Sequence, residues 1–108
     1  MRLRVREGSE LVVNVANDEV LTFSPTGQLV RTEHAAQAGN DGLVIMPDGT
    51  KYVSSVLNGG VSRIRAGKPA ELIARNIPSA ASMCYDAAAN QLVIPMNPNN
   101  GLAFVRLE

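Results

Sequence analysis

The chain has 108 residues, 45% of them hydrophobic and 19% charged, which is the composition of one small globular domain. Ten basic residues balance ten acidic ones, so the chain lacks the basic surplus that a nucleic-acid-binding protein needs. No apolar run reaches the roughly 18 residues of a membrane-spanning helix, and the N-terminal stretch carries no signal peptide. We therefore expect a soluble protein that binds neither nucleic acid nor membrane, with its compartment left open.

One basic cluster stands out from this neutral background. Arg2, Arg4 and Arg6 occur at every second position, and this spacing places all three on one face of a β-strand. The pattern predicts a solvated sheet edge, with a polyanion contact as the alternative.

Short runs of β-forming residues recur along the whole chain, each bounded by turn residues, and no segment shows the apolar period of a helix. The patterns predict about eleven strands and no long helix. In chain order the expected strands are 3–6, 11–15, 20–23, 28–32, 43–46, 51–56, 61–65, 71–74, 82–85, 91–96 and 102–107.

These strands repeat with a period near 40 residues. The pairs Val12-Val13, Tyr52-Val53 and Leu92-Val93 are 40 residues apart, and Val20, Val61 and Leu102 are 41 apart. A period of this length built from strands alone is typical of a β-propeller, in which each blade is a four-stranded antiparallel sheet. The sequence predicts an all-β partial propeller with blades at about 1–34, 42–76 and 79–108, the last without its outer strand. A β-sandwich with accidental spacing is the alternative.

Two and three-quarter blades cannot close a ring, because about four blades are the minimum. The first and last blades would each leave an apolar face in water, and the last would also leave an open strand edge. We therefore expect either a homo-oligomer, in which two copies make a six-bladed ring, or the C-terminal part of a longer propeller.

Residues 40–64, NDGLVIMPDGTKYVSSVLNGGVSRI, carry a family likeness. Asp41-Gly42, Pro47-Asp48-Gly49, Tyr52-Val53 and Asn58-Gly59-Gly60-Val61 stand where blades of the senescence-marker-protein/gluconolactonase/LRE-like propellers have their characteristic turns and strands. The segment resembles a blade of that family. The first unit resembles the broader NHL-type repeat.

The resemblance implies a divalent cation, often calcium, held in the central channel by carboxylate and amide oxygens, as suits a hard cation. The family's ligand role carries over to Asp41 only, at the start of an inner strand. Met1-Arg2-Leu3 stands at the matching place of the first blade, so the metal site is incomplete within this chain. The alternative interpretation of Asp41 is a turn residue that caps its own backbone.

Two functions follow. The first is a propeller scaffold or binding module that holds a small-molecule ligand or partner at the channel mouth through Asn40, Asn58, Asn97, Asn99 and Asn100. The alternative is a metal-dependent lactonase or esterase of the gluconolactonase kind, with Asp41 as one ligand and the catalytic residues unassigned. Calcium or another divalent cation is the only cofactor that the sequence implies.

The remaining reactive side chains have plainer interpretations. His34 is the only histidine. It ends an outer strand, so we expect it at the surface. Cys84 is the only cysteine and is expected to be a small buried hydrophobic residue. Asp48-Gly49 predicts a hairpin turn, and Asn58-Gly59-Gly60 is read as a turn as well as a candidate for the channel mouth.

Overall fold

The computed structural model describes residues 1–4, 8–96 and 100–107, apart from the side chains of Arg2 and Arg4. The interpretation of the basic cluster therefore lies outside the described side chains. Every regular element of the described residues is a β-strand, and there are eleven of them. They are β1 (Arg2–Arg4), β2 (Glu10–Val13), β3 (Glu19–Phe23), β4 (Leu29–His34), β5 (Asn40–Ile45), β6 (Lys51–Ser55), β7 (Val61–Ile64), β8 (Glu71–Ala74), β9 (Cys84–Asp86), β10 (Gln91–Met96) and β11 (Gly101–Arg106).

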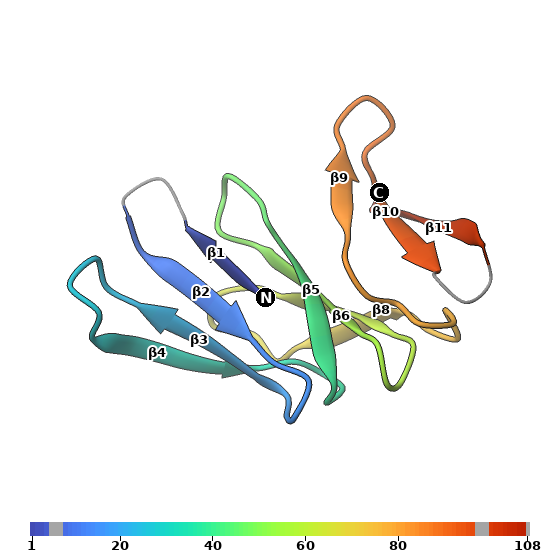
Figure 1. Cartoon of the computed structure of the whole chain (residues 1–108). Coiled ribbons are helices and arrows are strands. Elements are labelled where there is room, and N and C mark those ends of the chain that lie inside the picture. Colours follow the sequence, from blue (N-terminus) through green and yellow to red (C-terminus); the bar gives the residue numbers. More distant parts are fainter. Residues whose placement is uncertain (5–7, 97–99, 108) are drawn as a thin grey trace.

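The strands form three antiparallel sheets in which each strand pairs with its neighbour in sequence. The sheets are β1-β2-β3-β4, β5-β6-β7-β8 and β9-β10-β11, called here blades 1, 2 and 3. In Figure 1 the three blades follow one another in chain order, from the blue sheet to the red one. Four, four and three strands is the pattern expected from the sequence.

Two apolar clusters hold the blades together. The first lies between blades 1 and 2 and contains the buried residues Leu11, Val13, Val20, Ala35, Leu43, Val53 and Ile64. The second lies between blades 2 and 3 and contains Tyr52, Val61, Ile77, Ala80, Met83, Leu92 and Ile94. Each cluster draws on the facing sides of two sheets, so burial of apolar surface between blades is what joins them.

The alternation of side chains along a strand explains how one blade serves both clusters. In β6, Val53 points toward blade 1 and Tyr52 toward blade 3, and all five residues of this strand are buried. In β11, by contrast, Ala103 and Val105 pack toward blade 2, whereas Leu102 and Phe104 are 54% and 59% exposed. The central blade is thus covered on both faces and blade 3 on one.

The structural repeat is 41 residues in both middle strands. The cross-strand pairs Val12–Leu21, Val53–Ser62 and Ile94–Ala103 occupy equivalent places in the three blades. The predicted 40-residue equivalence of Val13 and Val53 is wrong, because these two residues belong to the same cluster and meet from opposite sheets. A shift of one residue reverses the face on which a strand side chain lies.

Two other expectations are corrected. Cys84 is exposed. It lies opposite Val93, whereas the neighbouring residues of β9 and β10, Tyr85 and Leu92, pack toward blade 2. In addition, β5 begins at Asn40 rather than Leu43, because the chain pairs with β6 through an irregular register between Asn40 and Gly42. The strand therefore starts three residues earlier than the predicted 43–46.

The turn at Asp48-Gly49 is confirmed. Gly49 has a φ of 91°, a backbone conformation that glycine adopts without steric cost. The Asp48 carboxylate accepts a hydrogen bond from the Thr50 amide at 2.9 Å. This hydrogen bond, followed by one from the Thr50 side chain, lowers the pKa of Asp48 below its usual value. The role of Asp48 is therefore to shape the hairpin between β5 and β6.

Candidate functional site

The connections after β2, β4, β6, β8 and β10 all lie at the same end of the sheets, because the strands alternate in direction. Backbone hydrogen bonds join them: the amide of Asn40 donates to Asn14 O, that of Val56 to Gly39 O and that of Ile77 to Gly59 O. We call this end the upper loop face, although it lies at the bottom of Figure 1. It comprises residues 14–18, 35–39, 56–60, 75–83 and 100. The predicted ligand residues Asn58 and Asn100 belong to this face, and Asn40 directly follows one of its connections.

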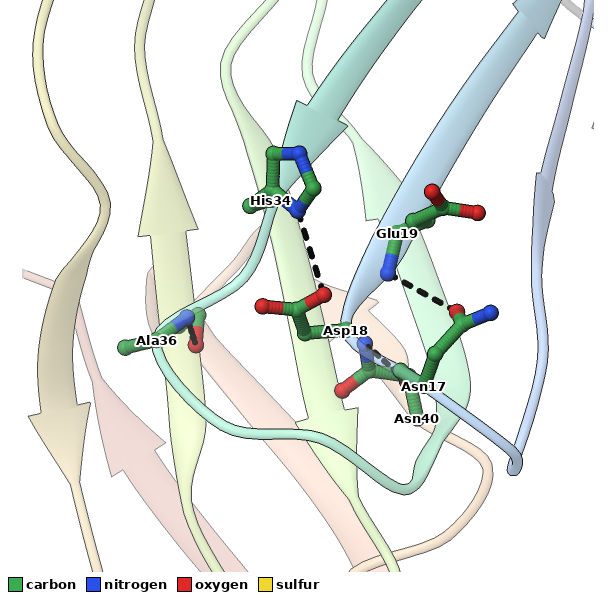
Figure 2. Close-up of polar contacts among 7 residues, drawn as sticks. Asn17, Asp18, Glu19, His34, Ala36 and Asn40 are labelled. Carbon is green, nitrogen blue, oxygen red and sulfur yellow. Dashed lines mark hydrogen bonds and ion pairs between the residues drawn. The ribbon is translucent and has the colours of Figure 1, made fainter.

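Asn40 is the most buried of the predicted ligand residues, with 1% of its surface exposed. Its Nδ2 donates to the Asn17 carbonyl oxygen at 3.4 Å, a contact drawn in Figure 2. Its Oδ1 is buried and has no hydrogen-bond partner among the described residues. The side chain therefore ties β5 to the loop after β2 and keeps one acceptor unused.

Asp41 follows Asn40 at the irregular step between β5 and β6. It is half-buried. Within the described residues no group of three or more His, Cys, Asp or Glu side chains could hold a metal ion. Calcium takes six to eight oxygen ligands, so the described donors alone do not fit the cation that the resemblance implies.

Asn58 is exposed, and two of its hydrogen bonds shape the loop after β6. Its backbone amide donates to Ser55 Oγ and its Nδ2 donates to the Ala38 carbonyl oxygen, each at 2.9 Å. Asn100 is exposed with a φ of 56°, a left-handed conformation that asparagine tolerates. Asn97 and Asn99 lie outside the described residues. Asn58 is thus tied to the connection 35–39, whereas Asn40, which follows that connection, is tied to the loop after β2.

His34 lies at the surface, as the sequence predicts. Its Nδ1 is 3.1 Å from Asp18 Oδ1, and both side chains are more than a third exposed. Figure 2 shows this pair beside the loop that carries Asn17, whose Oδ1 accepts a hydrogen bond from the Glu19 amide. These contacts order the upper loop face and bring two titratable groups to its outer side.

Three buried serines of blade 2 hold the connections between the blades, a role that the sequence did not predict. Ser55 Oγ donates to the Ala38 carbonyl oxygen at 2.6 Å, Ser62 Oγ accepts from the Ala36 amide at 2.9 Å, and Ser54 Oγ donates to the Ala81 carbonyl oxygen. Each hydroxyl belongs to blade 2 and each partner belongs to a connection between blades. The signal in the sequence was the run of small polar residues at strand positions that otherwise carry apolar side chains.

An ion-pair cluster fixes the outer edge of blade 2. Glu71 Oε1 accepts from Arg63 Nε at 3.0 Å and from Arg65 Nη2 at 2.8 Å. The hydrogen bond from Arg63 holds the pKa of Glu71 below its usual value and raises that of Arg63. These groups stabilise the pairing of β7 with β8 and lie away from the upper loop face.

Comparison with known proteins supports the fold and goes no further. No family model matches the chain, and no curated protein matches it. A solved structure of a streptogramin B lyase is similar, with a TM-score of 0.68 and 11% sequence identity over 98% of this chain and 39% of that one. This chain therefore spans less than half the length of the structure it matches. No helix long and apolar enough to cross a membrane occurs in the described residues. The likeness shows the fold alone: the chain is an all-β, partial β-propeller of three small antiparallel sheets.

Proposed function

We propose that this chain is a binding module that supplies three blades to a propeller ring, and that a second copy of the chain completes the ring. A small-molecule ligand or partner is then held at the upper loop face. The observation that carries the proposal is the uncovered flank of blade 3, which presents Leu102 and Phe104 to solvent.

The open flank of blade 3 is apolar at the positions equivalent to those through which blade 2 packs on blade 3. Tyr52 and Val61 of blade 2 pack toward blade 3 and are 6% and 0% exposed. The residues 41 positions later are Val93 and Leu102, and Leu102 is 54% exposed. Covering such a flank with another sheet stabilises an assembly by roughly 25 cal/mol for each Å² of apolar surface removed from water.

Blade 1 offers the matching flank. Val53 and Ile64 of blade 2 pack toward blade 1, and the residues 41 positions earlier are Val12 and Phe23. Both are half-buried and lie outside the two apolar clusters. Within the chain, blade 1 packs on blade 2 and blade 2 packs on blade 3 through equivalent faces. The open flanks of blade 3 and blade 1 are the two faces that a third contact of this kind would need. Blade 3 of one copy would pack on blade 1 of the next in a head-to-tail arrangement, which closes when the rotation returns to its start.

The open edge of blade 3 supports the same proposal. Among the described strands β11 pairs only with β10. An unpaired edge of this kind accepts an added strand from a partner. The eleven described strands of each copy already lie in its own sheets, so a strand that completes the four-stranded pattern of blades 1 and 2 would come from a further partner segment.

Sedimentation velocity at about 10 μM, well above the dissociation constants of stable homo-oligomers, tests the proposal. We expect the purified chain to sediment as an assembly of whole copies. The double variant Leu102→Asp/Phe104→Asp should sediment as a monomer that keeps its β circular dichroism. Leu57→Asp is the matched control, since Leu57 is 67% exposed on a loop away from the flank. A folded wild-type monomer at this concentration would overturn the proposal.

The metal-dependent lactonase or esterase is the alternative that the family resemblance implies. It needs oxygen ligands beyond Asp41, and further blades would have to supply them. Calcium titration of the chain, described in the Discussion, separates this alternative from the binding module.

A further inference from the structure

β11 lies at the margin of blade 3, and no described strand pairs with its outer side (Figure 1). In blades 1 and 2 the equivalent strands, β3 and β7, each pair with a fourth strand, β4 or β8. β11 therefore has a free edge where the other two blades have a strand. The edge consists of backbone groups and is distinct from the apolar flank of the proposed ring, so binding to it does not depend on ring closure.

The backbone groups at this edge follow from the pairing of β11 with β10. The amide of Leu107 donates to Asn90 O at 3.0 Å, so these two residues form a hydrogen-bonded pair that continues the β10–β11 register. Hydrogen-bonded pairs alternate with non-bonded ones in an antiparallel ladder. Alternate residues of β11 therefore bond to β10. The residues between them, whose N–H and C=O groups face the open edge, are Leu102, Phe104 and Arg106.

β11 repeats the sequence pattern of β7. Residues 60–65 read GVSRIR and residues 101–106 read GLAFVR, 41 positions later. The first glycine and the last arginine are the same in both, and the second and fifth residues are aliphatic in both. Because β8 pairs with β7, β8 is a template for the strand that β11 can accept.

The template indicates the charge that the added strand needs. Glu71 of β8 lies opposite Arg63 and accepts hydrogen bonds from Arg63 and Arg65 at 3.0 and 2.8 Å. Arg65 recurs in β11 as Arg106, and Phe104 stands in place of Arg63. No ion pair is formed by Arg106 within the part of the chain that the structure describes. A carboxylate at the Glu71 position of an added strand would supply the missing counter-charge.

Aliphatic residues follow the carboxylate in the template. Ile73 and Ala74 pack beside the apolar cluster between blades 2 and 3. Ala74 lies opposite Val61, whose equivalent in β11 is Leu102. Leu102 is 54% exposed, whereas Val61 is fully buried. An aliphatic residue opposite Leu102 would therefore remove part of this apolar side chain from water.

We propose that the free edge of β11 binds an extended segment of a partner protein in which an acidic residue is followed by aliphatic residues. The segment runs antiparallel to β11, as β8 does to β7, and pairs with the backbone of Phe104 and Arg106 by strand addition. Its carboxylate accepts a hydrogen bond from the Arg106 guanidinium. The segment belongs to another protein, because the described strands of this chain all lie in its own sheets.

A peptide with the sequence of residues 69–76, PAELIARN, is the probe. Fluorescence anisotropy of the labelled peptide measures its binding to the full chain, and we expect saturation with a dissociation constant below about 1 mM. The Glu71→Gln peptide should bind about fivefold more weakly, which is the effect of one partly exposed ion pair. The Arg106→Gln chain should bind both peptides equally, at the weaker affinity. Arg75→Gln, at an exposed position after β8, is the control and should behave as the parent chain.

Methylation of single peptide amides tests the backbone pairing. The Ser55 amide donates to Gly60 O, so by alternation along β7 the backbone of Arg63 faces β8 and its partner Glu71 faces β7. N-methylation of the peptide at Glu71 should weaken binding at least about tenfold, because it removes a donor from the ladder. N-methylation at Leu72, whose amide faces away, should leave binding unchanged. Equal effects of the two methyl groups would contradict strand addition.

Hydrogen exchange locates the bound peptide. The amides of Phe104 and Arg106 face the edge and should exchange at least about tenfold more slowly with saturating peptide. Those of Ala103 and Val105, already bonded to β10, should change little. No saturation at about 5 mM peptide, or protection gained on another strand instead, overturns the proposal. Sedimentation is read separately: a monomer that binds the peptide removes the ring and keeps the edge site, and an assembly that does not bind it does the reverse.

Discussion

Lys51 Nζ lies 2.8 Å from Glu33 Oε1, and the two side chains are only 10% and 17% exposed. The pair joins β6 of blade 2 to β4 of blade 1. It lies beside the apolar cluster of Leu11, Val53 and Ile64, where water screens charges weakly. This ion pair therefore crosses the same boundary that the apolar residues hold together.

Lys51→Met should destabilise the chain by about 3 kcal/mol, because it leaves the Glu33 carboxylate buried without a counter-charge. The double variant Lys51→Met/Glu33→Leu should recover most of that loss, since it removes both charges and keeps apolar volume. Urea unfolding followed by circular dichroism measures both. A double variant as unstable as the single one would show that the pair stabilises the fold by attraction rather than by mutual neutralisation.

Gly42→Ala should destabilise the fold by at least about 2 kcal/mol, in the range of overpacked cores. A Cβ at this position would overlap the carbonyl oxygen of Ala81, which is backbone and cannot rotate away. Gly49→Ala is the control: a Cβ there meets open space, so its cost is only the strain of a φ of 91°, about 1 kcal/mol. Thermal unfolding ranks the two, and equal losses would contradict the close approach at Gly42.

Ser55→Ala should cost about 2 kcal/mol, because it removes a donor to Ala38 O and an acceptor for the Asn58 amide. Ser82→Ala, at an exposed position, should leave stability unchanged. Hydrogen exchange of the Asn58 amide offers a second measurement, and its protection should fall in the Ser55 variant. Unchanged protection would mean that the loop after β6 is held by its backbone alone.

Stability should decline in acid partly through Glu71. Its folded pKa lies below its usual value of 4.5, so the ionised carboxylate favours the folded state at pH above that value. The contribution is lost as the pH falls below 4.5 and the carboxyl becomes protonated. Glu71→Gln should flatten this part of the melting-temperature profile between pH 6 and 3, which differential scanning fluorimetry records. If the melting temperature of the variant fell with pH as steeply as that of the parent, other carboxylates would be responsible for the acid sensitivity.

Calcium should leave the melting temperature of the chain unchanged, because Asp41 is the one carboxylate at the β5–β6 irregularity and calcium requires a larger oxygen shell. The titration compares the parent chain with Asp41→Ala in the absence and presence of calcium. A saturable stabilisation that disappears in Asp41→Ala would favour the lactonase or esterase over the binding module. Asp86→Ala serves as a carboxylate control far along the chain.

The strands and turns were predictable because their causes are local. Alternation of apolar residues and the turn chemistry of Asp48-Gly49 are properties of neighbours in sequence. The face of the sheet on which each side chain lies was harder to predict. The repeat of Val12-Val13, Tyr52-Val53 and Leu92-Val93 suggests a period of 40, whereas the cross-strand pairs fix it at 41. A buried strand carries similar apolar residues on both faces, so the sequence alone did not distinguish a period of 40 from one of 41.

The candidate site was predictable only in part. Asparagines near turns pointed to this end of the sheets, where Asn40 contacts the loop after β2 and Asn58 contacts Ala38 of the connection between blades 1 and 2. Their role as ligand residues stays a prediction. The exposure of Cys84 depends on which sheet covers blade 3, and the ion pair of Lys51 with Glu33 depends on how two sheets lie against each other. Both are long-range properties for which the spacing of residues in the chain carries no signal.

The serine contacts of blade 2 have a consequence for how such modules diversify. The hydroxyls of Ser54, Ser55 and Ser62 form hydrogen bonds with main-chain atoms of Ala81, Ala38 and Ala36, respectively. None of these anchors depends on the partner's side chain. The side chains of the segments between the blades can therefore change while neighbouring blades keep the same relative orientation. New binding residues could be introduced in these segments without altering the sheets.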